Sequence, residues 1–137
     1  MITAGSSRLN AARVLIGLVL FFNLQAAILF ILNPAAYAAG FEVSGVAGEK
    51  IVQGMGILFL MWNVPYVFAL VHPVRYRTSL IQAVIMQAIG VIGETVLRLT
   101  LTPGHQALET TANRFILFDA AGLLVLLAAA WITRSRR

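Results

Sequence analysis

Two acidic residues, Glu94 and Asp119, lie in stretches of sequence that are otherwise almost entirely apolar. The chain has 137 residues and holds only five Asp and Glu residues in total. An ionisable side chain at the centre of a bilayer costs roughly 3 kcal/mol on insertion scales, so such a residue needs a partner or a function. Two neighbouring carboxylates can share a proton for acid–base or relay chemistry, or they can bind the polar end of a lipophilic molecule.

The composition indicates where these residues lie. The chain is 60% hydrophobic and 11% charged, with a mean hydropathy of +0.88, whereas soluble domains carry about 25% charged residues. Each of four apolar runs is close to or above the roughly 18 residues that indicate a spanning helix. The runs are residues 14–32, 51–71, 80–97 and 115–132. We predict an all-α, integral membrane four-helix bundle that forms a single transmembrane domain over residues 1–137.

The basic residues predict an orientation. Lys and Arg are enriched in short cytoplasmic loops of membrane proteins, and in a four-pass chain most of the arginines fall on one side. These are Arg8, Arg13, Arg75, Arg77, Arg134, Arg136 and Arg137. We therefore expect both termini to be cytoplasmic. The net charge of +5 indicates attraction to lipid headgroups beside the spans, and we expect the bilayer, not nucleic acid, as the partner of these residues.

Proline predicts two local features between and within the spans. Asn33-Pro34 can start a short helix that Gly40 ends, and we expect this helix to be interfacial, in the first outer loop. Pro65 has no backbone N–H and therefore predicts a kink in the second span beside Trp62 and Asn63.

Polar residues of the four spans predict a polar cluster. Counting along the spans places Glu94 and Asp119 at one level, with Arg98 and Arg114 nearer the outer headgroups. Because Glu94 and Arg98 are four residues apart, they share a helix face and can pair. The candidate cluster or ligand pocket is Glu94, Asp119, Arg98, Arg114, Gln87, Asn63, Asn23 and Gln25.

This cluster has three interpretations. Amides and ion pairs can simply hold membrane helices together. Alternatively, the cluster lines a cavity that binds a lipophilic molecule with a polar end, or it carries protons. Two interpretations stay open for the aromatic residues Phe59, Trp62 and Tyr66: they line a cavity, or, as is more common for aromatics at helical spacing, they belong to the core or face lipid.

Other chemistry finds less support in the sequence. His72 and His105 fall on opposite sides of the membrane in this topology and cannot share one metal or haem. No serine lies deep in a span to act as a nucleophile, and the chain has no cysteine. We therefore predict no catalytic residue, metal or cofactor, and regard enzymatic activity as the less favoured reading.

Three segments carry a resemblance to a known group. Residues 54–66 (GMGILFLMWNVPY), followed by His72-Pro73 and by residues 87–94 (QAIGVIGE), resemble uncharacterised small four-helix membrane proteins of bacteria and, in outline, the DoxX-like group. The resemblance is one of architecture and transfers no site residue. It implies a multi-pass protein of the bacterial cytoplasmic (inner) membrane, with a respiratory accessory role or a role not assigned.

These observations leave three hypotheses about function. The leading one is a noncatalytic membrane subunit or accessory protein of a larger assembly, respiratory or electron-transferring, with other membrane subunits or further copies of the chain as partners. The alternative is a stand-alone binder or enzyme for a quinone or lipid that uses the Glu/Asp/Arg pocket. The third is a proton or ion pathway.

Overall fold

The structure, a computed structural model, describes residues 3–134. All regular elements in that range are helical, as predicted. They are α1 (Thr3–Leu32), α2 (Ala35–Ala38), the 3-10 helix η1 (Ala39–Phe41), α3 (Gly45–Trp62), α4 (Val64–Val71), α5 (Arg77–Thr100) and α6 (Gln106–Ile132).

Four segments of the described residues are long and apolar enough to cross a membrane: Ser6–Leu32, Gly45–Val71, Arg77–Thr100 and Gln106–Ile132. Each contains one predicted span and extends it, mostly at its N-terminal end. A helix continues as long as its backbone hydrogen bonds continue, so polar residues such as Glu49 and Glu109 are helical as well. By length and composition, this is a multi-pass membrane protein.

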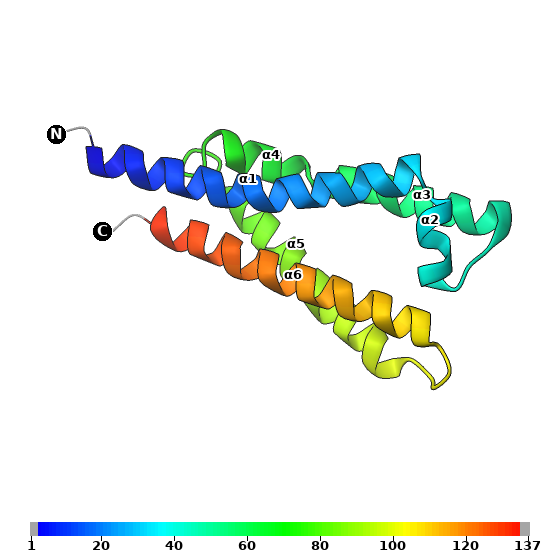
Figure 1. Ribbon diagram of the computed structural model, residues 1–137. Helices are drawn as coiled ribbons and strands as arrows, with labels where there is room; N and C mark the ends of the chain where they lie inside the picture. Colours follow the sequence, from blue (N-terminus) through cyan, green and yellow to red (C-terminus); the bar gives the residue numbers. More distant parts are fainter. Residues whose placement is uncertain (1–2, 135–137) are drawn as a thin grey trace.

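The helices form two pairs that diverge. Helix α1 lies along α3, α6 lies along α5, and α4 contacts both α1 and α5 (Figure 1). The start of α1 and the end of α6 lie at one end of the molecule, which we call the terminal end, and the pairs spread toward the other end, where α2 lies (Figure 1). A close-packed core joins α1, α4, α5 and α6, with the fully buried Ile16, Leu80 and Leu126 among its residues. A second, aromatic-rich cluster surrounds Phe30 toward the α2 end.

The second spanning segment is interrupted at Asn63, where the kink was predicted. Helix α3 ends at Trp62 and α4 starts at Val64, with Pro65 in its first turn. Pro65 cannot donate to the carbonyl four residues earlier. That carbonyl belongs to Met61. At the break itself the Asn63 N–H bonds to the Leu60 carbonyl at 3.2 Å, and the Asn63 side-chain Nδ2 donates to the Phe59 carbonyl at 2.6 Å.

The short helix after Asn33-Pro34 is present but ends later than predicted. Helix α2 continues into η1, and the turn that ends it is at Glu42, whose φ is 54°, rather than at Gly40. The Glu42 N–H donates to the Ala39 carbonyl at 3.1 Å, which explains why the chain remains helical past Gly40.

Arginines join the helices at the terminal end. Arg13 Nε of α1 donates to the Leu70 carbonyl of α4 at 3.1 Å, and Arg77 Nη1 of α5 donates to the Ala130 carbonyl of α6 at 3.4 Å. Arg8, Arg75 and Arg134 belong to the same end by their places in the helix order. Arg136 and Arg137, which share the predicted basic fringe, lie outside the described residues.

Helix α3 can lie close to α1 because residue 56 is glycine. A Cβ on Gly56 would stand 2.8 Å from the Ala27 carbonyl oxygen and 3.0 Å from Phe30 Cβ, whereas a Cβ on Gly54 would meet nothing within 4 Å.

We predict that Gly56→Ala lowers stability by about 1–3 kcal/mol, because the two helices must separate to admit the methyl group. Thermal melting in detergent checks this, with Gly54→Ala as the control, which keeps or raises stability because alanine favours helix. Equal melting temperatures of Gly56→Ala and wild type would contradict this close contact.

Candidate functional site

A cavity of about 470 Å³ lies among α1, the α2–η1 segment, α3, α4, α5 and α6. Aromatic rings form much of its wall: Phe22, Phe30, Tyr37, Phe41, Phe59, Trp62, Tyr66, Phe115 and Phe118. Its polar lining comprises Asn23, Gln25, Asn63, Gln87, Glu94, Thr111, Arg114 and Asp119. Seven of the eight predicted cluster residues therefore line one cavity, and Arg98 does not.

The amides near the helix break form the first polar group of the cavity. Asn23 Nδ2 of α1 donates to Asn63 Oδ1 at 3.1 Å, and Asn63 is buried. These two residues join α1 to the junction of α3 and α4. Gln25 lines the cavity from α1 but is exposed. The amides thus tie the break in the second span to the neighbouring helix.

A second polar group connects α4, α5 and α6. The Tyr66 hydroxyl is 2.6 Å from Gln87 Oε1 and can donate to it, and Gln87 Nε2 donates to Asp119 Oδ1 at 2.9 Å. Tyr66 is buried and its hydroxyl also lies 3.3 Å from the Ala83 carbonyl. Phe59, Trp62 and Tyr66 all line the cavity, while Tyr66 also belongs to the buried core and Trp62 is exposed, so both interpretations of these aromatics apply. Sequence gave a signal only for Tyr66, because its hydroxyl lies in a span.

Two glycines bring the acidic residue of α6 against α5. The Asp119 carboxylate occupies the space that a Cβ on Gly90 would need, with Asp119 Cγ 3.0 Å from that position. A Cβ on Gly122 would stand 2.6 Å from Gln87 Nε2. Any larger residue at position 90 would displace the carboxylate. The small residues therefore set where Asp119 lies.

The expected ion pair between Glu94 and Arg98 does not form. Among residues 3–134 the ion pairs are Arg98 with Glu109 and Glu42 with His105. Glu109 belongs to the facing helix α6 and pairs with Arg98. Arg98 does not line the cavity. Arg98 Nε and Glu94 Oε2 are both buried without a hydrogen-bond partner in the described chain.

The second predicted arginine, Arg114, does line the cavity. It is an exposed residue and forms no ion pair with Glu94 or Asp119 in the part of the chain that the structure describes. The carboxylates therefore share the cavity with one cationic side chain that does not contact them.

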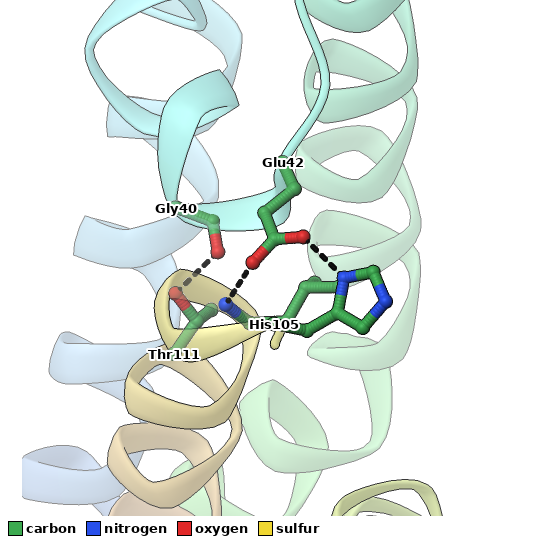
Figure 2. A network of polar contacts seen from close by, with 5 residues as sticks. Gly40, Glu42, His105 and Thr111 are labelled. Atoms are coloured by element: carbon green, nitrogen blue, oxygen red, sulfur yellow. Dashed lines mark hydrogen bonds and ion pairs between the residues drawn. The ribbon is translucent and has the colours of Figure 1, made fainter. Parts of the chain in front are cut away.

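The α2–η1 segment, which we call the roof, lines the cavity with Ala36, Tyr37, Gly40 and Phe41. Polar contacts hold the roof to α6 and to the turn before it (Figure 2). Glu42 Oε2 lies 2.6 Å from His105 Nδ1, and Thr111 Oγ1 donates to the Gly40 carbonyl at 2.7 Å. The Leu108 N–H also points to Glu42, at 3.4 Å. Nothing in the sequence indicated the contact between Glu42 and His105.

The histidines lie apart, as the topology implied. His105 contacts Glu42, whereas His72 Nδ1 accepts from the Arg75 N–H at 3.1 Å in the turn before α5. Within residues 3–134 no group of His, Asp and Glu residues is arranged to hold a metal ion.

Comparison with protein-family models, with curated proteins and with solved structures finds no match to this chain. The resemblance to the DoxX-like group therefore stays a prediction from sequence.

Glu42 makes the roof contact sensitive to acid. The hydrogen bond with His105 lowers the pKa of Glu42 from its ordinary value. A carboxyl whose pKa is lower in the folded state stabilises the fold above its ordinary pKa, and this stability is lost as the pH falls through the folded-state pKa.

We predict that melting temperature falls more steeply for the wild type than for Glu42→Gln between about pH 5.5 and about pH 3. Glu49→Gln, which removes the same charge nearby, serves as control and keeps the wild-type slope; equal slopes for wild type and Glu42→Gln would refute this.

Gln87 bridges two cavity residues, and its loss has a cost. We predict that Gln87→Leu lowers stability by about 1–3 kcal/mol, because Asp119 loses its donor inside the protein. Thermal melting measures the change. Gln82→Leu is the matched control on α5, because Gln82 is exposed and its replacement leaves no buried group unpaired. Equal effects of the two substitutions would show that the Gln87 hydrogen bonds contribute nothing specific.

Proposed function

We propose that this protein binds a lipophilic small molecule with a polar end in the cavity between its two helix pairs. The proposal rests on one observation: a single cavity has aromatic walls and is lined by seven of the eight polar residues predicted from the spans. Small-molecule sites have this composition, with apolar walls and a few convergent polar groups. Its volume of about 470 Å³ is within the range of about 300–1,000 Å³ of such sites.

The wall residues favour an amphiphilic ligand. Phe30, Phe59 and Phe115 pack mutually, with ring centroids 5.7 to 6.2 Å apart, and offer a rigid apolar surface. Gln87, Glu94 and Asp119 offer hydrogen-bonding groups in the same cavity. The apolar body of a ligand would lie against the rings and its polar end against the amide and carboxylates.

The cavity wall reaches the lipid-facing surface. Phe22, Leu29 and Trp62 line the cavity yet are 45%, 40% and 48% exposed. A molecule dissolved in the bilayer can therefore reach the site sideways, between the diverging helix pairs. This route suits a ligand that is poorly soluble in water.

The proposed setting is the bacterial cytoplasmic membrane, with both termini in the cytoplasm and the roof at the opposite surface. The arginines of the terminal end support this orientation through the preference of Lys and Arg for the cytoplasmic side. The short α2 helix would then lie at the outer interface, near the mouth of the cavity.

Cavity geometry favours this binding role over the accessory-subunit hypothesis. Exposed apolar side chains on the spanning helices are accounted for by lipid alone, so they do not call for a partner subunit. The accessory-subunit role and the proton or ion pathway stay predictions from sequence. We propose no reaction.

The proposal predicts a ligand that copurifies with the protein. After gentle extraction, native mass spectrometry and analysis of the organic extract should find one lipophilic molecule at fixed stoichiometry. Ala26 lines the cavity, and Ala26→Phe should reduce the copurified amount by about tenfold, since overpacking of more than about 1.4 kcal/mol has that effect.

Ala121→Phe is the matched control, because Ala121 lies on α6 and is exposed. Retention of the molecule by Ala121→Phe, and its loss from Ala26→Phe, would place it in the cavity. Equal amounts in both variants, or wild type without any such molecule, would refute the proposal.

A further inference from the structure

Charge in the cavity narrows the class of ligand. Two carboxylates and one guanidinium group line it, those of Glu94, Asp119 and Arg114. Arg114 is exposed, whereas Glu94 and Asp119 are partly buried. The partly buried charged groups of the cavity are therefore two carboxylates, whereas its basic group, Arg114, is exposed.

Glu94 has an oxygen that no donor of the protein satisfies. Its Oε2 is buried and has no hydrogen-bond partner among residues 3–134. Leaving a buried acceptor unpaired is unfavourable, and more so for a charged group. A ligand that donates a hydrogen bond here would remove that cost.

Asp119 lies in the same cavity and is only partly satisfied. Its Oδ1 accepts from Gln87, while its carboxylate lies directly against Gly90. Gln87 is neutral, so Asp119 gains a hydrogen bond but no opposite charge. Both carboxylates thus have no cationic partner in the described part of the chain.

Arg98 and Lys50 make their polar contacts with other residues, although Arg98 Nε has no hydrogen-bond partner among residues 3–134. Arg98 forms its ion pair with Glu109, and Lys50 Nζ donates to Gln53 Oε1 at 2.7 Å. The protein therefore does not bring these groups to Glu94 or Asp119. A cation would have to come with the ligand.

Aromatic walls favour the same ligand charge. The faces of Trp, Tyr and Phe rings are negative and attract cations within about 6 Å, with a contribution that rises when the site is dry. Phe59 and Trp62 lie next to each other in the wall, with ring centroids 6.4 Å apart, and Phe115 lies 6.2 Å from Phe59. The rings and the carboxylates line the same cavity, and both favour a cationic ligand over an anionic one.

We infer that the ligand is a lipophilic cation, an alkyl amine or related amphiphile, whose nitrogen lies beside Glu94 and Asp119 and whose chain lies against the aromatic wall. This inference rests on the proposed binding function and specifies its substrate class. The amine N–H groups would donate to Glu94 Oε2, which has no other donor, and the positive charge would offset both carboxylates.

Two probes of equal chain length test this inference. Dodecylamine is cationic at neutral pH, whereas dodecanol is a neutral hydrogen-bond donor. Isothermal titration of the full protein in nanodiscs of zwitterionic lipid, with empty nanodiscs subtracted, measures both. We expect dodecylamine to bind saturably and at least about tenfold more tightly than dodecanol, which is about 1.4 kcal/mol.

Substitutions of the two carboxylates test whether the amine binds beside them. Glu94→Gln and Asp119→Asn should each weaken dodecylamine binding by about tenfold or more and leave dodecanol binding unchanged. Glu49→Gln is the control, because it removes a carboxylate that does not line the cavity. Should an acidic-site variant fail to fold, the amine-to-alcohol ratio of the wild type still decides.

The outcomes separate this inference from the function on which it rests. Equal binding of the two probes, unaffected by Glu94→Gln, would overturn the cationic ligand and leave a neutral amphiphile as the molecule bound. Saturable binding of neither probe, together with no copurified molecule, would overturn the binding function as well.

Discussion

Hydrocarbon offers the backbone no hydrogen-bond partner, so each spanning segment must satisfy its own amides and carbonyls. Helices α1, α5 and α6 do so as continuous helices. The second span cannot, because Pro65 has no N–H for the Met61 carbonyl and the helix breaks at Asn63. At the break the Asn63 N–H bonds to the Leu60 carbonyl, and the Asn63 side chain donates to the Phe59 carbonyl. Asn63 in turn accepts from Asn23. The first polar residues of the cavity are therefore a requirement of the broken backbone, and their presence at this depth does not by itself imply chemistry.

The break also separates two kinds of packing. Helix α4 contacts both α1 and α5, whereas α3 follows α1 and α5 follows α6 (Figure 1). Toward the terminal end a dense core results, and toward the α2 end the pairs spread around the cavity. Within α5 and α6, Gly90 and Gly122 admit Asp119 and Gln87 into the contact between the helices. Glu94 is not accounted for in this way, since its buried oxygen has no partner, and it is the residue that points most directly to a ligand.

Much of this structure could be predicted from sequence, for physical reasons. Apolar length identified the four spans, and proline identified the break. Seven of the eight proposed polar residues line one cavity because hydrocarbon drives such groups inward. Arg98 pairs with Glu109 rather than with Glu94, because four-residue spacing identifies neighbours on its own helix but not the register of α6, which presents Glu109. Cavity lining was only one of the interpretations of Phe59 and Trp62, because such side chains suit lipid, core or cavity equally. Glu42 and His105 are 63 residues apart, and no periodicity relates two loops.

The roof shows why the cavity and the stable core occupy different ends. Its contacts to α6 include exposed groups, Glu42 and His105, and exposed ion pairs contribute little to stability. Tyr37 and Phe41 of the roof also pack on Phe30, with ring centroids 4.9 and 5.8 Å from that of Phe30. The roof is therefore held chiefly by the rings that also form the cavity wall. Any molecule that displaces those rings loosens the roof, whereas Ile16, Leu80 and Leu126 do not line the cavity, although their cluster shares Tyr66 with the cavity lining. Exchange of a ligand at the α2 end can therefore leave Ile16, Leu80 and Leu126 in place, and Tyr66, which contacts Ala83 and Gln87 of α5, is the residue through which the cavity meets that core.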